Sequence, residues 1–190
     1  MNNFYLPVEF EYDAKPLLEL AEKYLIPDYH DCQDCIRDDT YNFQPGYHER
    51  IDDLGASHRT CMLRLHKLPE DVSDLTIITD LCRLFKNTEK HCNPDHVFQY
   101  LYFFNIAGVL PVHCDLRTVG FNIPLSGVDA PVTWHDHNGV EIARYTYQGP
   151  TLINTQINHG SLSNTGDRLF LSLGGFSEPF KDICEAISEN

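Results

Sequence analysis

Residues 117–125 read RTVGFNIPL and residues 168–174 read RLFLSLG, and the two stretches share a period of two. In an extended strand, alternate side chains point to opposite faces. The apolar face of the first stretch would carry Val119, Phe121, Ile123 and Leu125, and the other face Thr118, Asn122 and Pro124. In the second stretch Leu169, Leu171 and Leu173 would share one face, and Arg168, Phe170 and Ser172 the other. Both stretches are therefore predicted strands with one apolar face and one mixed face.

Short strand-like segments separated by turn residues continue through the rest of the C-terminal half. Further strands are expected at residues 98–106, 131–136, 141–147 and 151–158, with turn residues at 108–111, 126–129, 137–139, 149–150 and 163–167. A weakly alternating segment at residues 59–65 brings the total to about eight, the number of strands in a jelly roll. The sequence thus predicts a mainly β protein with a jelly-roll core.

The N-terminal half has a helical period instead. Residues 14–25 predict an amphipathic helix that ends before Pro27, and residues 69–90 predict a second helix with Ser73 as its N-cap. Both helices are expected to cover one outer sheet face. Residues 28–55 are expected to be irregular, and residues 180–188 to form a short final helix.

Length and charge narrow the class of protein. With 190 residues, the chain is expected to form one domain over 1–190, divided into a helical and loop support region (1–93), a β core (94–178) and a C-terminal tail (179–190). The net charge of −14 argues against nucleic acid as a partner, because phosphate binding needs basic side chains. The absence of a long apolar run and of a signal-like start favours a cytoplasmic protein without a membrane partner. Nothing in the pattern indicates the oligomeric state.

The cysteines give a weaker signal. There are seven, an odd number at scattered spacings, which is typical of reduced intracellular thiols rather than a disulfide scaffold. Cys32 and Cys35 form a C-x-x-C pair with His30 and His48 nearby. A zinc site and an ordinary polar loop both remain open there.

His113-Cys114-Asp115 is the first candidate for chemistry. In a strand, His113 and Asp115 would point to the same face, and His159 at the end of a later strand could supply a third ligand. Two imidazoles and one carboxylate make the facial triad of non-haem Fe(II) oxygenases. A hydrogen-bonded His–Asp pair with an unrelated surface histidine is the alternative.

Arg168 is the second candidate. A buried arginine on a strand needs an anionic partner, and a dicarboxylate would provide one, with Ser172 further along the same face able to bond the same carboxylate. A salt bridge to one of the many acids is the other interpretation. Arg117 and Asn122 are candidates to line the same pocket; Arg117 could equally pair with an acid, and Asn122 with a neighbouring backbone.

Taken in order, His113, Asp115, Arg117, the run 122–125, Asn154, His159, Asn164, Arg168 and Ser172 resemble the 2-oxoglutarate/Fe(II)-dependent oxygenases over about residues 97–176. The nearest groups are the small aspartyl/asparaginyl β-hydroxylase-like proteins and the short oxygenase-like proteins of bacteria and viruses. The resemblance implies a double-stranded β-helix, which is a jelly-roll variant.

The resemblance also implies a set of roles. Iron would be held by His113, Asp115 and His159, and 2-oxoglutarate would chelate the metal with its far carboxylate on Arg168. Dioxygen would be consumed, a substrate hydroxylated, and succinate and CO2 released. The animal aspartyl β-hydroxylases have Gly in place of the Asp, so the retained Asp115 argues against Asp/Asn specificity. It also argues against a halogenase, in which a halide replaces the carboxylate.

Two other functions stay open at this point. One is a cupin-like metal enzyme that does not use 2-oxoglutarate, and the other is a catalytically silent jelly-roll binding protein. Only the oxygenase needs an arginine at position 168. The substrate, a small molecule or a peptide, is not specified, although the acidic surface favours a cationic one.

The remaining motifs favour structural roles. His135-Asp136-His137 runs into the hairpin signal Asn138-Gly139 and is expected to lie in a solvated loop. Trp134 is expected in the core. Tyr102 is expected to pack within a strand, with a hydrogen bond to the cosubstrate as the alternative. The acidic residues 28–39 are expected to form a solvated loop or a lid.

Overall fold

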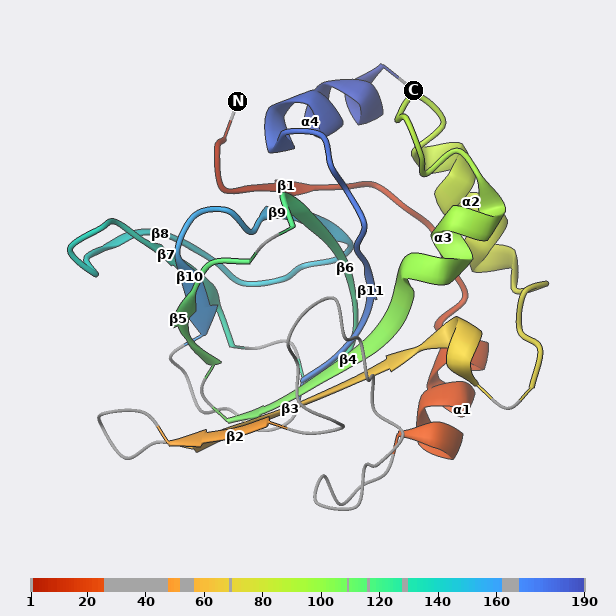
Figure 1. The fold of residues 1–190 in the computed structure, drawn as a ribbon, viewed down its shortest axis with the longest axis horizontal. Helices are drawn as coiled ribbons and strands as arrows, with labels where there is room; N and C mark the ends of the chain where they lie inside the picture. Colours follow the sequence, from red (N-terminus) through yellow and green to blue (C-terminus); the bar gives the residue numbers. More distant parts are fainter. Residues whose placement is uncertain are drawn as a thin grey trace.

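The computed structural model describes residues 2–25, 48–51, 57–68, 70–108, 110–115, 117–127, 130–161 and 168–189. Eight consecutive strands form the centre of the fold (Figure 1): β4 (Leu101–Gly108), β5 (Leu110–His113), β6 (Val119–Ser126), β7 (Val132–His135), β8 (Glu141–Tyr145), β9 (Thr151–Asn154), β10 (His159–Ser161) and β11 (Arg168–Leu173). They pair in a nested, antiparallel way: β4 with β11, β5 with β10, β6 with β9, and β7 with β8. This nesting is the topology of a jelly roll, and it confirms the predicted fold class.

The eight strands divide between two sheets. The smaller sheet has the order β5-β10-β7-β8. The larger has the order β1-β9-β6-β11-β4-β3-β2, because β1 (Tyr5–Pro7), β2 (His48–Ile51) and β3 (Ser57–Arg64) extend the jelly-roll strands at both edges. The prediction that residues 28–55 are irregular is wrong at β2. The prediction of a turn at 108–111 is wrong at Leu110 and Pro111, which lie in β5.

The helices follow the predictions with two corrections. Helix α1 (Ala14–Tyr24) begins where the Asp13 carboxylate accepts a hydrogen bond from Lys15 N, and α4 (Phe180–Ser188) lies where expected. The predicted helix at 69–90 is wrong at both ends: α2 spans Thr76–Leu84, and its N-cap position is Leu75, not Ser73.

The predicted strand at 98–106 is wrong in its first residues, which belong to α3 (Pro94–Tyr100). Asn93 caps α3 and Pro94 favours its first turn, so the chain stays helical until β4. A 3-10 turn (Leu65–Lys67) follows β3, and no helix in the described part of the chain is long and apolar enough to cross a membrane.

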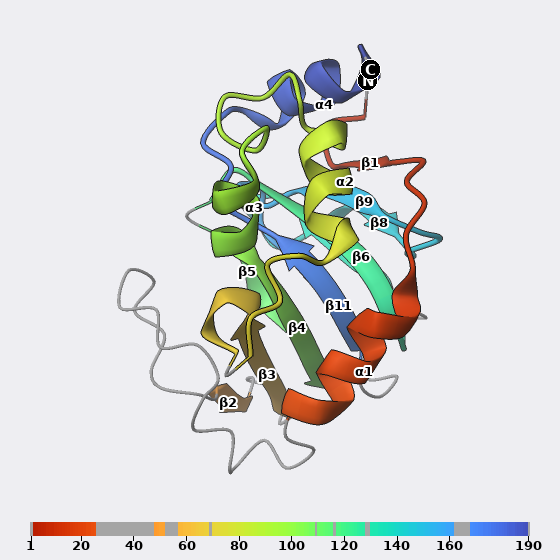
Figure 2. The same ribbon diagram turned by 90° about the vertical axis from the view of Figure 1, so that its right-hand side faces the viewer.

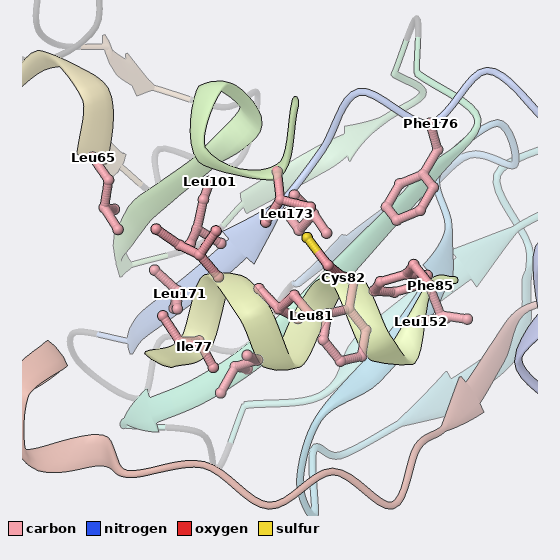
Figure 3. Packing of buried hydrophobic residues seen from close by; sticks show 14 of the residues in the cluster. Leu65, Ile77, Leu81, Cys82, Phe85, Leu101, Leu152, Leu171, Leu173 and Phe176 are labelled. Atoms are coloured by element: carbon pink, nitrogen blue, oxygen red, sulfur yellow. The ribbon is translucent and has the colours of Figure 1, made fainter. Parts of the chain in front are cut away.

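The main hydrophobic core lies outside the jelly roll. Helices α1 and α2 cover the outer face of the larger sheet, as predicted (Figure 2). Figure 3 shows Leu81 of α2, and Phe85 at the C-cap of that helix, packed against sheet residues such as Leu171 and Leu152. The apolar face of β6 also faces this core, and Phe121 is fully buried in it. Burial of each such side chain stabilises the fold by roughly 1.5–3 kcal/mol.

The space between the two sheets is lined differently. A smaller apolar cluster fills part of it, made of Ile106, Val132, Trp134, Tyr145, Tyr147, Ile153 and Phe170. Trp134 is fully buried, stacks on Tyr5 with ring centroids 5.7 Å apart, and donates from Nε1 to Asn154 O, which confirms its place in the core. Because Phe170 faces this space, its face-mates Arg168 and Ser172 face it as well. The helices thus stabilise the larger sheet from outside, while apolar and polar side chains share the space between the sheets.

Candidate metal centre

The pairing of β5 with β10 brings two histidines together. His113 is the last residue of β5 and His159 the first of β10, and they are direct partners in the antiparallel register. Their ring centroids lie 4.5 Å apart. Residues distant in sequence therefore meet because the jelly roll pairs its second strand with its seventh.

Asp115 joins the two histidines from the segment after β5. Its backbone N donates to Thr155 O at 2.9 Å, which holds the segment in place. Its Oδ1 atom lies 3.4 Å from His113 Nε2. One ligand atom from each of His113, Asp115 and His159 lies within 4.8 Å of the others. The three side chains predicted to hold the metal thus converge, and among the described residues no other such group of three His, Cys, Asp or Glu occurs.

His159 is in the form that binds metals. It is 4% exposed, and burial lowers its pKa to about 4, with the neighbouring His113 adding to the effect and Asp115 opposing it. It is therefore neutral at pH 7. Its Nδ1 is 2.9 Å from Ile157 O, an acceptor, so Nδ1 carries the proton and Nε2 offers a lone pair.

Asp115 is ionised. Burial alone would raise its pKa, but the charge of Arg117, the hydrogen bond from His113 and the proximity of His159 together hold the pKa of this carboxyl below its usual range. The donor set is therefore one carboxylate and two imidazoles. This set fits a divalent first-row metal such as Fe(II), and it leaves coordination positions for other ligands.

Arg168 lies in the interior, at the start of β11. It is 2% exposed, and its guanidinium donates to Ser161 Oγ from β10 and to Gly108 O at the end of β4. The predicted buried arginine on the inward face of the last core strand is present. The sequence analysis did not identify Ser161. It lies two residues after His159 on the same strand, and this spacing could have indicated that the two side chains share a face.

Asn122 and Ser172 meet on neighbouring strands of the larger sheet. Ser172 Oγ donates to Asn122 Oδ1 at 2.8 Å, and Asn122 Nδ2 donates to Tyr147 Oη at 2.8 Å. Asn122 therefore contacts side chains rather than a neighbouring backbone. Burial raises the pKa of Tyr147 to about 12, with the hydrogen bond from Asn122 and the charges of Arg117 and Arg168 opposing the rise. The sequence analysis did not single out Tyr147, whose phenol remains protonated and able to donate.

Arg117 pairs with an acid, one of the alternatives that the sequence left open. Its Nε donates to Asp115 Oδ2 at 2.7 Å, and its Nη1 donates to Tyr102 Oη. Tyr102 is 5% exposed and reaches the site through this contact, so it does more than pack within β4.

Other candidate residues lie apart from this cluster. His135 was expected in a solvated loop, and that prediction is wrong: it ends β7, is 4% exposed, and bonds Thr133 Oγ1 at 2.9 Å and Gly139 O at 3.1 Å. His137, in the following turn, is exposed as expected. Cys32, Cys35, His30, Asn164, the side chain of His48 and the acidic residues 28–39 lie outside the described residues.

Comparisons with known proteins do not assign the site a role. No protein-family model matches the chain, and no curated protein matches it. The crystal structure of a full-length Neurospora crassa protein in complex with alpha-KG is similar at 10% sequence identity, with a TM-score of 0.49, over 88% of this chain and 71% of that one. The fold and the site described above rest on the strand pairing and side-chain contacts of this chain.

Proposed function

We propose that this chain is a non-haem Fe(II)- and 2-oxoglutarate-dependent dioxygenase that hydroxylates a small molecule or a peptide side chain and releases succinate and CO2. The observation that carries the proposal is the convergence of His113, Asp115 and His159 within 4.8 Å. The catalytic core would be residues 94–178, which contain the jelly-roll strands β4 to β11, with residues 1–93 as its support.

The donor atoms suit Fe(II) and leave it reactive. A His₂–carboxylate set occupies one face of an octahedral ion, so about three positions stay open for cosubstrate and dioxygen. When bound, the iron supplies the activation of dioxygen. The protein holds two of the three ligands in their metal-binding forms, because His159 is neutral and Asp115 is ionised.

The interior side chains suit a dicarboxylate. The guanidinium of Arg168 offers a fork of N–H donors to the far carboxylate of 2-oxoglutarate, and burial strengthens such a bond. Ser172 and Asn122, with Tyr147 beside them, add polar groups on the same inward face. Arg117 adds a second positive charge on the metal side. Together these groups would favour a dianionic cosubstrate, with Arg168 as the residue that would hold its far carboxylate.

The experiment is a succinate assay with Fe(II), 2-oxoglutarate and air. Wild type is expected to form succinate slowly even without its substrate. His159→Ala should fall to the background rate, and Arg168→Met should need roughly 10–100 times more 2-oxoglutarate. His137→Ala, in an exposed turn, is the matched control and should behave as wild type.

Two results would overturn the proposal. Succinate formation that does not depend on His159 would place the chemistry elsewhere. Metal-dependent consumption of dioxygen without any effect of 2-oxoglutarate or of Arg168→Met would identify a cupin-like enzyme instead.

A further inference from the structure

We infer that Arg117 is a positioning residue that holds Asp115 as a one-oxygen ligand, so that the metal keeps its remaining positions open. The inference rests on the proposed metal centre and adds a role that the ligand set alone does not supply. It concerns the carboxylate oxygen of Asp115 that would not bind the metal.

The two oxygens of Asp115 have different neighbours. Oδ2 accepts a hydrogen bond from Arg117 Nε at 2.7 Å, the length of a strong charge-assisted bond. Oδ1 lies 3.4 Å from His113 Nε2, on the side of the two histidines. The carboxylate is therefore oriented with one oxygen toward the arginine and one toward the metal ligands.

The guanidinium itself has little freedom to move. Its Nη1 donates to Tyr102 Oη on β4. The backbone comes close to it twice: a Cβ added at Gly120 would lie 3.6 Å from Arg117 Cζ, and one at Gly174 would lie 3.6 Å from Nη1. Arg117 O also accepts a hydrogen bond from Thr155 Oγ1, and Thr155 O accepts one from Asp115 N. Main chain and side chain thus fix Arg117 and Asp115 relative to each other.

This arrangement has a direct consequence for coordination. A carboxylate with both oxygens available can bind a metal through both, and it would then take a position that the cosubstrate or dioxygen needs. A carboxylate with one oxygen engaged by an arginine binds through the other. Arg117 therefore controls how many positions stay open, which an ion pair of purely structural value would not do. Its side chain is 18% exposed and that of Asp115 22%, so the ion pair is largely shielded from water and from screening by salt.

The test counts the water molecules on bound Mn(II), used in place of Fe(II), by water-proton relaxation. Wild type should carry about three, the number that a facial triad leaves open. Arg117→Met removes the donor at similar side-chain length and should carry about two, because Asp115 then binds through both oxygens. Arg117→Lys keeps a cationic donor and should return toward about three. His137→Ala, in an exposed turn away from Asp115, is the control and should keep the wild-type number.

The outcomes separate this inference from the proposed function. If wild type carries about three waters and Arg117→Met does too, the inference is wrong and the metal centre stands. If His137→Ala loses a water as Arg117→Met does, the effect does not come from the bond between Arg117 and Asp115, and the inference is also wrong. If wild type binds no Mn(II), or binds it just as well after His159→Ala, the proposed metal centre fails first.

Discussion

Lowering the pH from 7 to 5 is expected to destabilise the metal-free protein, and His91 accounts for a defined part of that loss. His91 is 0% exposed, stacks on Phe176 at a centroid distance of 3.9 Å, and its Nε2 lies 2.8 Å from Gly174 O, to which it donates. Burial lowers its pKa from 6.5 to about 4, with the bond to Gly174 opposing the shift and His96 adding to it.

The magnitude follows from the difference in pKa between the folded and unfolded chains. Between pH 6.5 and 4 the unfolded chain binds a proton at His91 that the folded chain does not, so stability is complete above this window and falls as the pH drops through it. The full difference is about 3 kcal/mol in the free energy of unfolding, and about 2 kcal/mol of it is lost between pH 7 and pH 5.

Urea unfolding at pH 7, 6 and 5, with a chelator present, measures this loss. His91→Gln keeps an N–H donor for Gly174 O and cannot be protonated, so wild type should lose about 2 kcal/mol more than the variant over this range. His159, whose pKa is also lowered, contributes to both proteins and cancels in the comparison. Parallel pH profiles for wild type and His91→Gln would refute the reasoning.

Three further changes test the fold and the site. Phe121→Ala should lower the free energy of unfolding by roughly 3–5 kcal/mol, because it leaves a cavity under the helices, and the urea midpoint measures this loss. A loss under about 1 kcal/mol would contradict the described core. Ser172→Ala leaves Asn122 Oδ1 without its described donor and should cost roughly 1–3 kcal/mol in the same assay, whereas an unchanged midpoint would contradict the network. Mn(II) at about a hundred times its Kd should stabilise wild type by about 2.7 kcal/mol and His159→Ala far less, as measured by thermal unfolding, and equal stabilisation of both would place the metal elsewhere.

The fold was largely predictable because apolar and polar residues alternate clearly along its strands. Val119, Phe121 and Ile123 face the helices as the period of two indicates, and Asn122 faces the other way. The errors fall where local signals compete. The aromatic run after residue 98 has strand propensity, yet the cap at Asn93 and the proline at position 94 extend a helix into it. Short edge strands such as β1 and β2 carry too few residues to show a period.

The site was predictable in composition but not in its connections. The spacing of His113 and Asp115 shows that they share a face, because strand periodicity is local. The register that sets His159 opposite His113 depends on how β5 and β10 pair within the smaller sheet, which periodicity does not specify. The contacts of Arg117 with Asp115 and Tyr102 depend on side-chain placement and on the distant strand β4, so only the structure could choose among the alternatives for Arg117.

Anaerobic titration with Fe(II) and 2-oxoglutarate tests the central claim most directly, because it needs no substrate. The account predicts a visible charge-transfer band that requires both additions, is absent in His159→Ala, and needs more 2-oxoglutarate in Arg168→Lys, whose ammonium lacks the planar fork. Iron binding without any response to 2-oxoglutarate, or a band that survives in His159→Ala, would contradict it.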